Sequence, residues 1–171
     1  MIILRETGCH IAIPEVPTGV GFVYICPGRY EERVGYPCAG QTGAMLEALL
    51  PLLVETMPTI FTSAERTRYL ITNAWPRVEF RRKTGRSVPL KSELVSRVNL
   101  ERLYQEIKAL RYVVACGNLA HFAMENCHKA FPLDATVAKA FHTSRRALGC
   151  PTNAKLPVRL REWAESVATQ F

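Results

Sequence analysis

The chain has 171 residues, of which 48 % are hydrophobic and 22 % are charged. A chain of this length can bury roughly 70 % of its unfolded surface in one domain, and none of its apolar runs is long enough to span a membrane. The formal net charge of +7 predicts attraction to polyanions. We expect one domain over residues 1–171. Because the start of the chain lacks a secretory pattern, we expect it in the cytoplasm.

Short apolar runs alternate with segments of helical periodicity along the first two thirds of the chain. The run at 21–26 predicts a strand that is covered on both faces. The segment 42–57 predicts a helix in which Pro51 forces a kink or a break. A second strand is predicted at 69–74, and after a loop rich in Arg, Gly and Pro the periodicity at 92–110 predicts an amphipathic helix.

The same alternation continues to the end of the sequence. A third strand is predicted at 111–116, and Asn118 is placed to cap the helix that follows. A fourth strand is predicted at 136–141 and a closing amphipathic helix at 156–171. This order of elements predicts βαβ units. The expected fold class is therefore α/β, a three-layer α/β/α arrangement with a central four-stranded parallel sheet.

Polar residues and glycines follow the predicted strands at the points where the strands end. Pro27-Gly28 follows the first strand, Asn73 ends the second, Gly117 ends the third and His142 follows the fourth. In open parallel sheets, ligands bind beyond the carboxyl ends of the strands. These residues therefore predict a binding site at that edge.

Two basic clusters accompany these strand ends. One lies at 77–86 and includes Arg81 and Arg82, and the other is Arg145-Arg146. Each cluster alone is compatible with a solvated surface, but their positions after strand ends favour contacts with phosphate. The cysteines form no C-x-x-C pair, so we expect no metal site.

Five short motifs occur in a fixed order along the sequence. They are Y-I-C-P-G-R-Y-E at 24–31, G-Y-P-C-A-G-Q-T-G at 35–43, T-N at 72–73, A-C-G at 115–117 and H-T-S at 142–144.

In this order the motifs resemble those of the uracil-DNA glycosylase superfamily. The nearest pattern is that of bacterial branches with G-E-x-P-G-x-x-E, then G-x-P-F-x-G-x-x-G and later H-P-S. The resemblance covers about residues 20–150 and implies the fold described above. It identifies the chain as a divergent member.

Three departures from that pattern affect the expected chemistry. Cys26 stands where many relatives have Asp or Asn to position the attacking water, and other branches have Ala there. Cys38 replaces the aromatic residue that stacks on the base, and Thr143 replaces the Pro of H-P-S. The smaller Cys38 would leave room for a base larger than uracil, or Tyr30 or Tyr36 would do the stacking.

The resemblance implies roles for three residues. Glu31 would hold a water and stabilise a cationic sugar, although a loop carboxylate can also cap a helix or pair with Arg29 or Arg33. Asn73 would read the edge of the base, unless it is a strand-end Asn bonded to a turn. His142 would stabilise the departing base.

The remaining expected contacts divide into a base pocket and a DNA surface. The base pocket would comprise Cys26, Pro27, Gly28, Tyr30, Tyr36 and Cys38. The DNA surface would comprise Ser144, Arg145, Arg146, Arg81, Arg82 and Leu148. Leu148 would be either a wedge that fills the gap in the base stack or a simple packing residue.

Together these features predict a monofunctional DNA glycosylase that hydrolyses the N-glycosidic bond of a flipped uracil or modified base. It would need no cofactor, bind DNA and act as a monomer. Alternatives are a non-catalytic DNA-binding or interaction module of the same fold, a defence glycosylase for hypermodified phage bases, and, more weakly, an enzyme of nucleotide metabolism.

Overall fold

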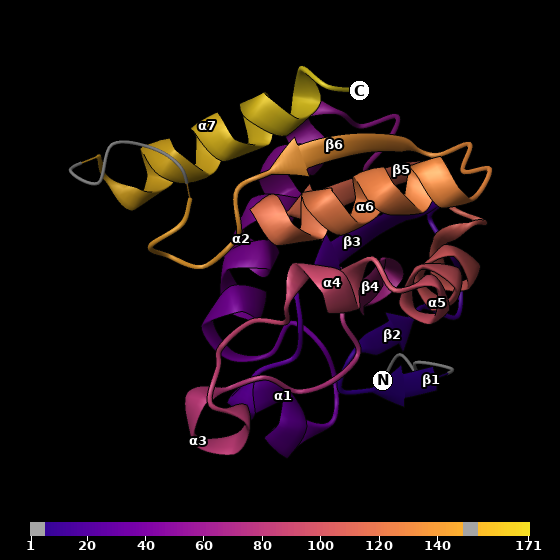
Figure 1. The fold of residues 1–171 in the computed structure, drawn as a ribbon. Coiled ribbons are helices and arrows are strands. Elements are labelled where there is room, and N and C mark those ends of the chain that lie inside the picture. The colour runs from indigo at the N-terminus through magenta and orange to yellow at the C-terminus, as the bar shows by residue number, and fades with distance from the viewer. Residues whose placement is uncertain (1–5, 149–153) are drawn as a thin grey trace.

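The computed structural model describes residues 6–148 and 154–171. Its centre is a six-stranded sheet in the order β1-β2-β4-β3-β5-β6 (Figure 1). The four strands β4, β3, β5 and β6 are mutually parallel, whereas β1 and β2 join antiparallel at the β4 edge. The strands are β1 Glu6–Gly8, β2 Ile11–Ile13, β3 Val20–Tyr24, β4 Leu70–Asn73, β5 Tyr112–Cys116 and β6 Thr136–Ala140.

Helices cover both faces of this sheet. Helices α2 and α7 pack on one face, and α5 and α6 pack on the other (Figure 1). The helices are α1 Arg29–Val34, α2 Gly40–Thr56, α3 Arg81–Thr84, α4 Lys91–Leu94, α5 Arg97–Ile107, α6 Asn118–Ala130 and α7 Leu156–Ala168, with a 3-10 turn η1 at Arg66–Arg68. The predicted three-layer α/β/α class is therefore confirmed.

The predicted count of four strands was wrong, because the sheet has six. The four predicted strands are all present as its parallel part. The two additional strands, β1 and β2, have only three residues each, so no alternating pattern is long enough to detect.

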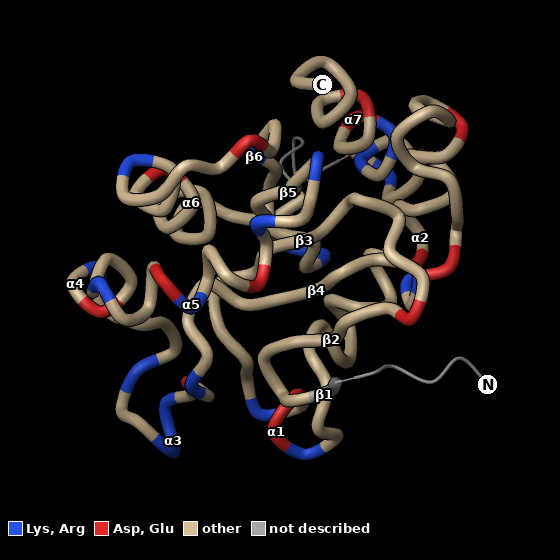
Figure 2. Tube along the Cα trace, turned by 90° about the vertical axis from the view of Figure 1, so that its right-hand side faces the viewer, with Lys and Arg blue, Asp and Glu red and all other residues tan. Residues whose placement is uncertain are grey.

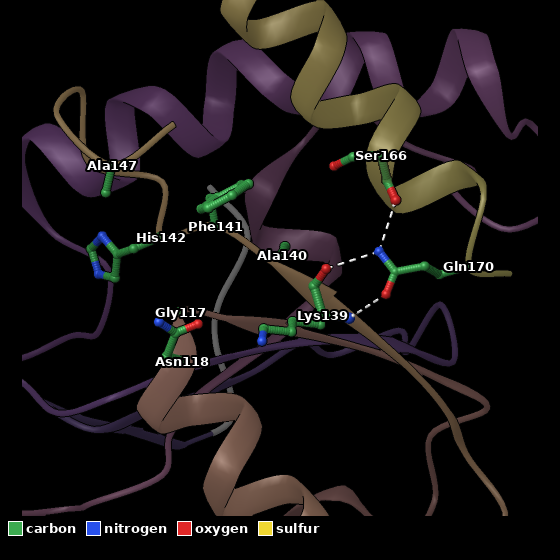
Figure 3. Close-up of a pocket in the computed structure, with 9 residues that line it drawn as sticks. All are labelled: Gly117, Asn118, Lys139, Ala140, Phe141, His142, Ala147, Ser166 and Gln170. Carbon is green, nitrogen blue, oxygen red and sulfur yellow. Dashed lines mark hydrogen bonds between the residues drawn. The ribbon is translucent and has the colours of Figure 1, made fainter. Parts of the chain in front are cut away.

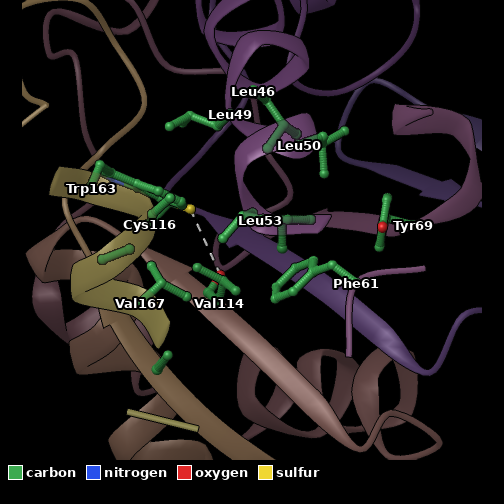
Figure 4. Packing of buried hydrophobic residues seen from close by; sticks show 14 of the residues in the cluster. Leu46, Leu49, Leu50, Leu53, Phe61, Tyr69, Val114, Cys116, Trp163 and Val167 are labelled. Carbon is green, nitrogen blue, oxygen red and sulfur yellow. Dashed lines mark hydrogen bonds between the residues drawn. The ribbon is translucent and has the colours of Figure 1, made fainter. Parts of the chain in front are cut away.

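Pleating of the strands divides the core into two clusters. Phe22 and Tyr24 of β3 point toward α2 and α7, and Val23 between them points toward α5 and α6. On α2, leucines at helical spacing are completely buried and pack near Trp163 of α7 (Figure 4). Each such leucine contributes about 1.5–3 kcal/mol through burial. The four are Leu46, Leu49, Leu50 and Leu53.

Three local predictions need correction. Helix α2 continues through Pro51, because the ring lies on the exposed side of the helix, so the predicted break does not occur. The helix predicted at 92–110 is divided into α4 and α5, with Ser96 as the N-cap of α5. The N-cap of α6 is Gly117, with φ 100°, and Asn118 is already the first helical residue.

The order of the parallel strands defines a switch point. The strand that follows β3 in the chain, β4, lies on one side of β3, and the next strand, β5, lies on its other side. The chain connections therefore run in opposite directions from the point between β3 and β5. A crevice at the carboxyl ends of such a strand pair is the usual ligand site of open α/β sheets. None of the helices in the described ranges has the length and apolar character needed to cross a membrane.

Gly43 provides a test of the packing at the start of α2. A Cβ atom at this position would overlap the Cys38 carbonyl oxygen and the Arg66 guanidinium that binds it. Cys38 has a fixed left-handed backbone, with φ 55°, so its carbonyl cannot easily move away. We expect Gly43→Ala to lower the free energy of unfolding by about 1–3 kcal/mol despite its better helix propensity.

Chemical denaturation measures this change. The control is Gln41→Ala, an exposed position on the same helical turn, where we expect a change below about 0.5 kcal/mol. Equal stability of Gly43→Ala and the wild type would show that the loop before α2 yields to the added methyl group.

Candidate functional site

His142 lies at the switch point, where three strands end. It follows β6, and its ring packs edge-on against Tyr24 of β3, with ring centroids 5.5 Å apart. Gly117, which follows β5, lies on another side of it, and a Cβ on Gly117 would be 3.6 Å from the Cβ of His142. The strand-end argument therefore placed this histidine at the correct edge.

The hydrogen bond of His142 determines which ring nitrogen can act as a donor. Nδ1 accepts the backbone N–H of Ser144 at 3.0 Å, so in the neutral ring the proton is on Nε2. Burial lowers the pKa of His142 below its ordinary value of 6.5, and the nearby charge of Glu31 opposes this shift. A neutral imidazole with an Nε2–H donor is therefore the favoured form near neutral pH.

Thr143 fixes the segment that carries His142. Its buried Oγ1 lies 3.1 Å from the Tyr24 hydroxyl and donates to the Thr42 carbonyl at 3.3 Å. Since a hydroxyl has one proton, the Tyr24 O–H is the donor to Thr143. This side chain thus connects three elements, which are β3, α2 and the segment that follows β6. A proline at this position could make neither bond. The departure from the motif pattern gave no indication of this role.

In this structure the Glu31 carboxylate holds two segments of its loop together through backbone hydrogen bonds. Oε2 accepts the N–H of Gly28 at 3.0 Å, which caps α1, and Oε1 accepts the N–H of Ala39 at 2.9 Å. The alternative that Glu31 caps a helix is therefore correct. Each carboxylate oxygen keeps a further lone pair for a water or a cation, and the carboxylate still acts electrostatically on His142.

Asn73 also makes structural contacts. Its side chain is only 2 % exposed, and Nδ2 donates to the carbonyl of His10 at 3.2 Å, while its backbone N–H donates to the same carbonyl at 3.0 Å. Both bonds attach the end of β4 to the hairpin formed by β1 and β2. The geometry thus favours the strand-end alternative over base reading.

Of the two cysteines of the predicted base pocket, Cys38 is buried and Cys26 is half-buried. Burial raises the pKa of Cys26 to about 12 and that of Cys38 to about 12, so both stay protonated at neutral pH. The Cys26 thiol lies 3.8 Å from the carbonyl of Ser87, and Cys38 packs into the part of the core that lies between the sheet and helices α2 and α7. Neither thiol has the lowered pKa of a nucleophile.

The other predicted pocket residues surround α1. Pro27 is buried, Gly28 is the N-cap of α1, and Tyr30 and Tyr36 are exposed. The Tyr36 ring lies under the Arg66 guanidinium, at 5.7 Å. The two tyrosines do not line the cavity next to His142.

That cavity, of about 400 Å³, lies beside the carboxyl end of β6 (Figure 3). His142 and Ala147 lie at one end, and Ser166 of α7 and Gln170, which follows α7, lie at the other, where Gln170 pairs with both backbone groups of Lys139. The lining of the cavity includes two of the residues predicted at the strand ends, Gly117 and His142, and of these only His142 was assigned a catalytic role. The remaining lining residues are Asn118, Ala140 and Phe141.

Sequence reasoning missed most of this lining. Gly117 and Asn118 after the third strand and His142 after the fourth were expected at this edge, and Phe141 is the direct neighbour of His142. Ser166 lies on α7 and Gln170 just after it, and the amphipathic pattern of this helix carries no sign of a site.

Four residues of the predicted DNA surface are exposed arginines, and Ser144 is half-buried. Arg145 and Arg146 follow His142, and Arg81 and Arg82 lie on α3 (Figure 2). Both segments flank the edge where the parallel strands end (Figure 1). Leu148 is only 1 % exposed and packs in the core between the sheet and helices α2 and α7, so of its two predicted roles the structure favours packing over a wedge.

No protein-family model matches the chain, and no curated protein sequence matches it. Within residues 6–148 and 154–171, no group of three or more His, Cys, Asp or Glu side chains is arranged to hold a metal ion. The resemblance to the glycosylases therefore depends on the sequence motifs alone.

Titration of His142 tests the buried environment. Its lowered pKa means that the unfolded chain binds the proton more readily, so the free energy of unfolding falls as the pH decreases through about 6.5. We expect an NMR titration midpoint for the His142 ring below that of the same residue in urea. His142→Gln assigns the signal, and a folded midpoint at or above the unfolded one would contradict the burial described here.

Proposed function

We propose that the protein is a DNA glycosylase that acts on a uracil or a modified base turned out of the DNA stack. The observation that carries the proposal is the His142 imidazole at the switch point, with Nδ1 occupied by Ser144 and Nε2–H available as a donor. Its position within the motif order at 24–31, 35–43 and 142–144 adds support.

The proposed reaction uses this donor at the leaving group. As the C1′–N bond breaks, its electron pair goes to the base, and the sugar becomes cationic at C1′. The Nε2–H of His142 would stabilise the negative charge that develops on a base oxygen. Water then supplies the hydroxyl at C1′, and its proton restores the neutral base. A neutral histidine suits this step, because it donates without first needing protonation at neutral pH.

Glu31 would contribute through its charge and its position. Its carboxylate stabilises a cationic sugar electrostatically, and its bonds to Gly28 and Ala39 hold the loop that would surround the base. The charge of Glu31 also acts on His142, whose pKa it raises against the larger effect of burial. A rigid carboxylate and a rigid imidazole would meet the substrate without reorganisation.

A non-catalytic DNA-binding module is the second candidate, and two observations favour it. The Cys26 thiol stays protonated, with a pKa of about 12, at the position where many relatives have an acid or an amide. Asn73 directs its amide to the His10 carbonyl instead of into the site. Base release by the purified protein separates the two candidates.

The chemical prediction concerns His142. We expect His142→Ala to slow single-turnover base release by roughly a hundredfold or more, because it removes stabilisation of charge that develops only as the bond breaks. The assay uses duplexes that carry uracil or modified bases, followed by alkali and detection of strand scission. The control is His128→Ala, at an exposed position on α6, which should keep the wild-type rate.

Two results decide between the candidates. No scission of any duplex by the wild type would favour the binding module, and wild-type rates in His142→Ala would remove the histidine from the mechanism. Asn73→Ala adds a further distinction. A loss of stability with unchanged selectivity would assign Asn73 to the hairpin, and relaxed selectivity would assign it to base reading.

DNA binding itself should depend on salt through the arginines that flank the site. Each phosphate contact releases counterions, so Arg145→Gln should reduce the slope of log K against log salt by about one unit. The control is Arg111→Gln, at an exposed position before β5, at the opposite edge of the sheet. Fluorescence anisotropy at several salt concentrations measures both slopes, and a reduced slope in both variants would show that the attraction is spread over the surface.

A further inference from the structure

A groove of about 310 Å³ lies between α1 and the residue that begins α3. It is separate from the cavity beside His142, although α1 follows the loop after β3 (Figure 1). Its volume is at the lower end of the range for small-ligand sites, which is about 300–1,000 Å³. The lining residues are Arg29, Tyr30, Glu32, Arg33 and Phe80.

Two aromatic rings form part of this lining. Tyr30 is 58 % exposed. Its ring lies next to Gly40, where an added Cβ atom would be 3.5 Å from the ring, and the Arg33 guanidinium is 5.3 Å from its centroid. Phe80 is half-buried and is the N-cap residue of α3.

The two walls of the groove are held together by buried and charged contacts. Glu79 donates its backbone N–H to the Pro27 carbonyl at 2.9 Å, and its carboxylate accepts the Trp75 Nε1–H at 3.0 Å and the Arg86 guanidinium at 2.6 Å. These bonds fix the residue before Phe80 to the loop that precedes α1. The groove is thus preformed.

The charges around the groove are mainly positive. Glu32 is paired with Lys83, and the carboxylate of Glu31 is occupied by backbone N–H groups. Within the described ranges, no carboxylate lies in ion-pair distance of Arg29, Arg33 or the two arginines of α3. The unneutralised guanidinium groups therefore complement an anion, and the exposed ring beside them complements a flat base.

We infer that this groove binds an unpaired nucleotide of a DNA strand, with its base against Tyr30 and Phe80 and its phosphate against Arg29 and Arg33. Aromatic rings interleaved with arginines are the usual means of binding single strands, because stacking needs an unpaired base. The inference rests on the proposed function for DNA as the ligand, but it requires no bond cleavage. It predicts that the protein binds single-stranded or locally opened DNA more tightly than an intact duplex.

The test compares two probes, a fluorescein-labelled oligothymidine and a duplex of the same length, by anisotropy at fixed salt. We expect Tyr30→Leu and Phe80→Leu each to weaken oligothymidine binding by about tenfold, because each removes a stacking surface. Duplex binding should change by less than about twofold. The control is Tyr104→Leu on α5, which removes a tyrosine that stacks on Phe131, away from the groove.

Tyr30→Leu is the decisive variant, because the ring is exposed and its loss leaves the core intact. Phe80 is half-buried, so thermal unfolding checks that Phe80→Leu keeps its fold. Wild-type oligothymidine affinity in Tyr30→Leu would overturn the inference. So would equal losses on both probes, which would make the groove a general phosphate surface, or failure of the wild type to bind oligothymidine. If base release is absent but oligothymidine binding depends on Tyr30, the inference stands and the proposed catalysis fails.

Discussion

The hydroxyl of Thr143 is the contact on which the geometry of the site depends. It accepts the Tyr24 O–H and donates to the Thr42 carbonyl, so three elements that are distant in the sequence meet at one buried atom. Leaving such a buried partner without a hydrogen bond costs about 1–3 kcal/mol. His142 is the preceding residue, and its ring direction is set by this anchor and by the Ser144 N–H. The position of the imidazole is thus a consequence of core packing.

A second set of contacts organises the opposite side of the strand ends. The Glu31 carboxylate accepts backbone N–H groups and closes the loop from Gly28 to Ala39. The Glu79 carboxylate accepts hydrogen bonds from the side chains of Trp75 and Arg86, and its backbone N–H donates to Pro27, which fixes the basic segment. Arg86 lowers the pKa of Glu79 to about 2, so this clamp stays charged over the whole neutral range. The carboxylates near the site are therefore largely occupied by structural bonds, which leaves the surrounding arginines free to attract phosphate.

The parts of this structure that could be predicted from the sequence are those with a local signal. Strands β3 and β5 are nearly continuous apolar runs, β4 and β6 are short segments between predicted helices, and His142 follows from the rule that sites lie at strand ends. Partners that are distant in the sequence could not be predicted. Asn73 binds the carbonyl of His10, and Glu31 binds the amide of Ala39, and neither contact leaves a pattern in the chain. For Leu148 the sequence left a wedge and a packing residue as alternatives, because an apolar residue after two arginines is compatible with either, and the structure buries it in the core.

The distribution of charge separates affinity from chemistry in this protein. Burial keeps the His142 imidazole unprotonated and the thiols of Cys26 and Cys38 protonated, and the Glu31 carboxylate is a negative charge near enough to act on His142. The rim is basic, with exposed arginines on α3 and after His142. Under the proposed function, a phosphate backbone would be attracted to this rim, and the base would meet the uncharged imidazole. Substitutions at the rim should act on binding and its salt dependence, whereas substitutions at the centre should act on the reaction step, so the two sets of variants report on different properties of the same edge.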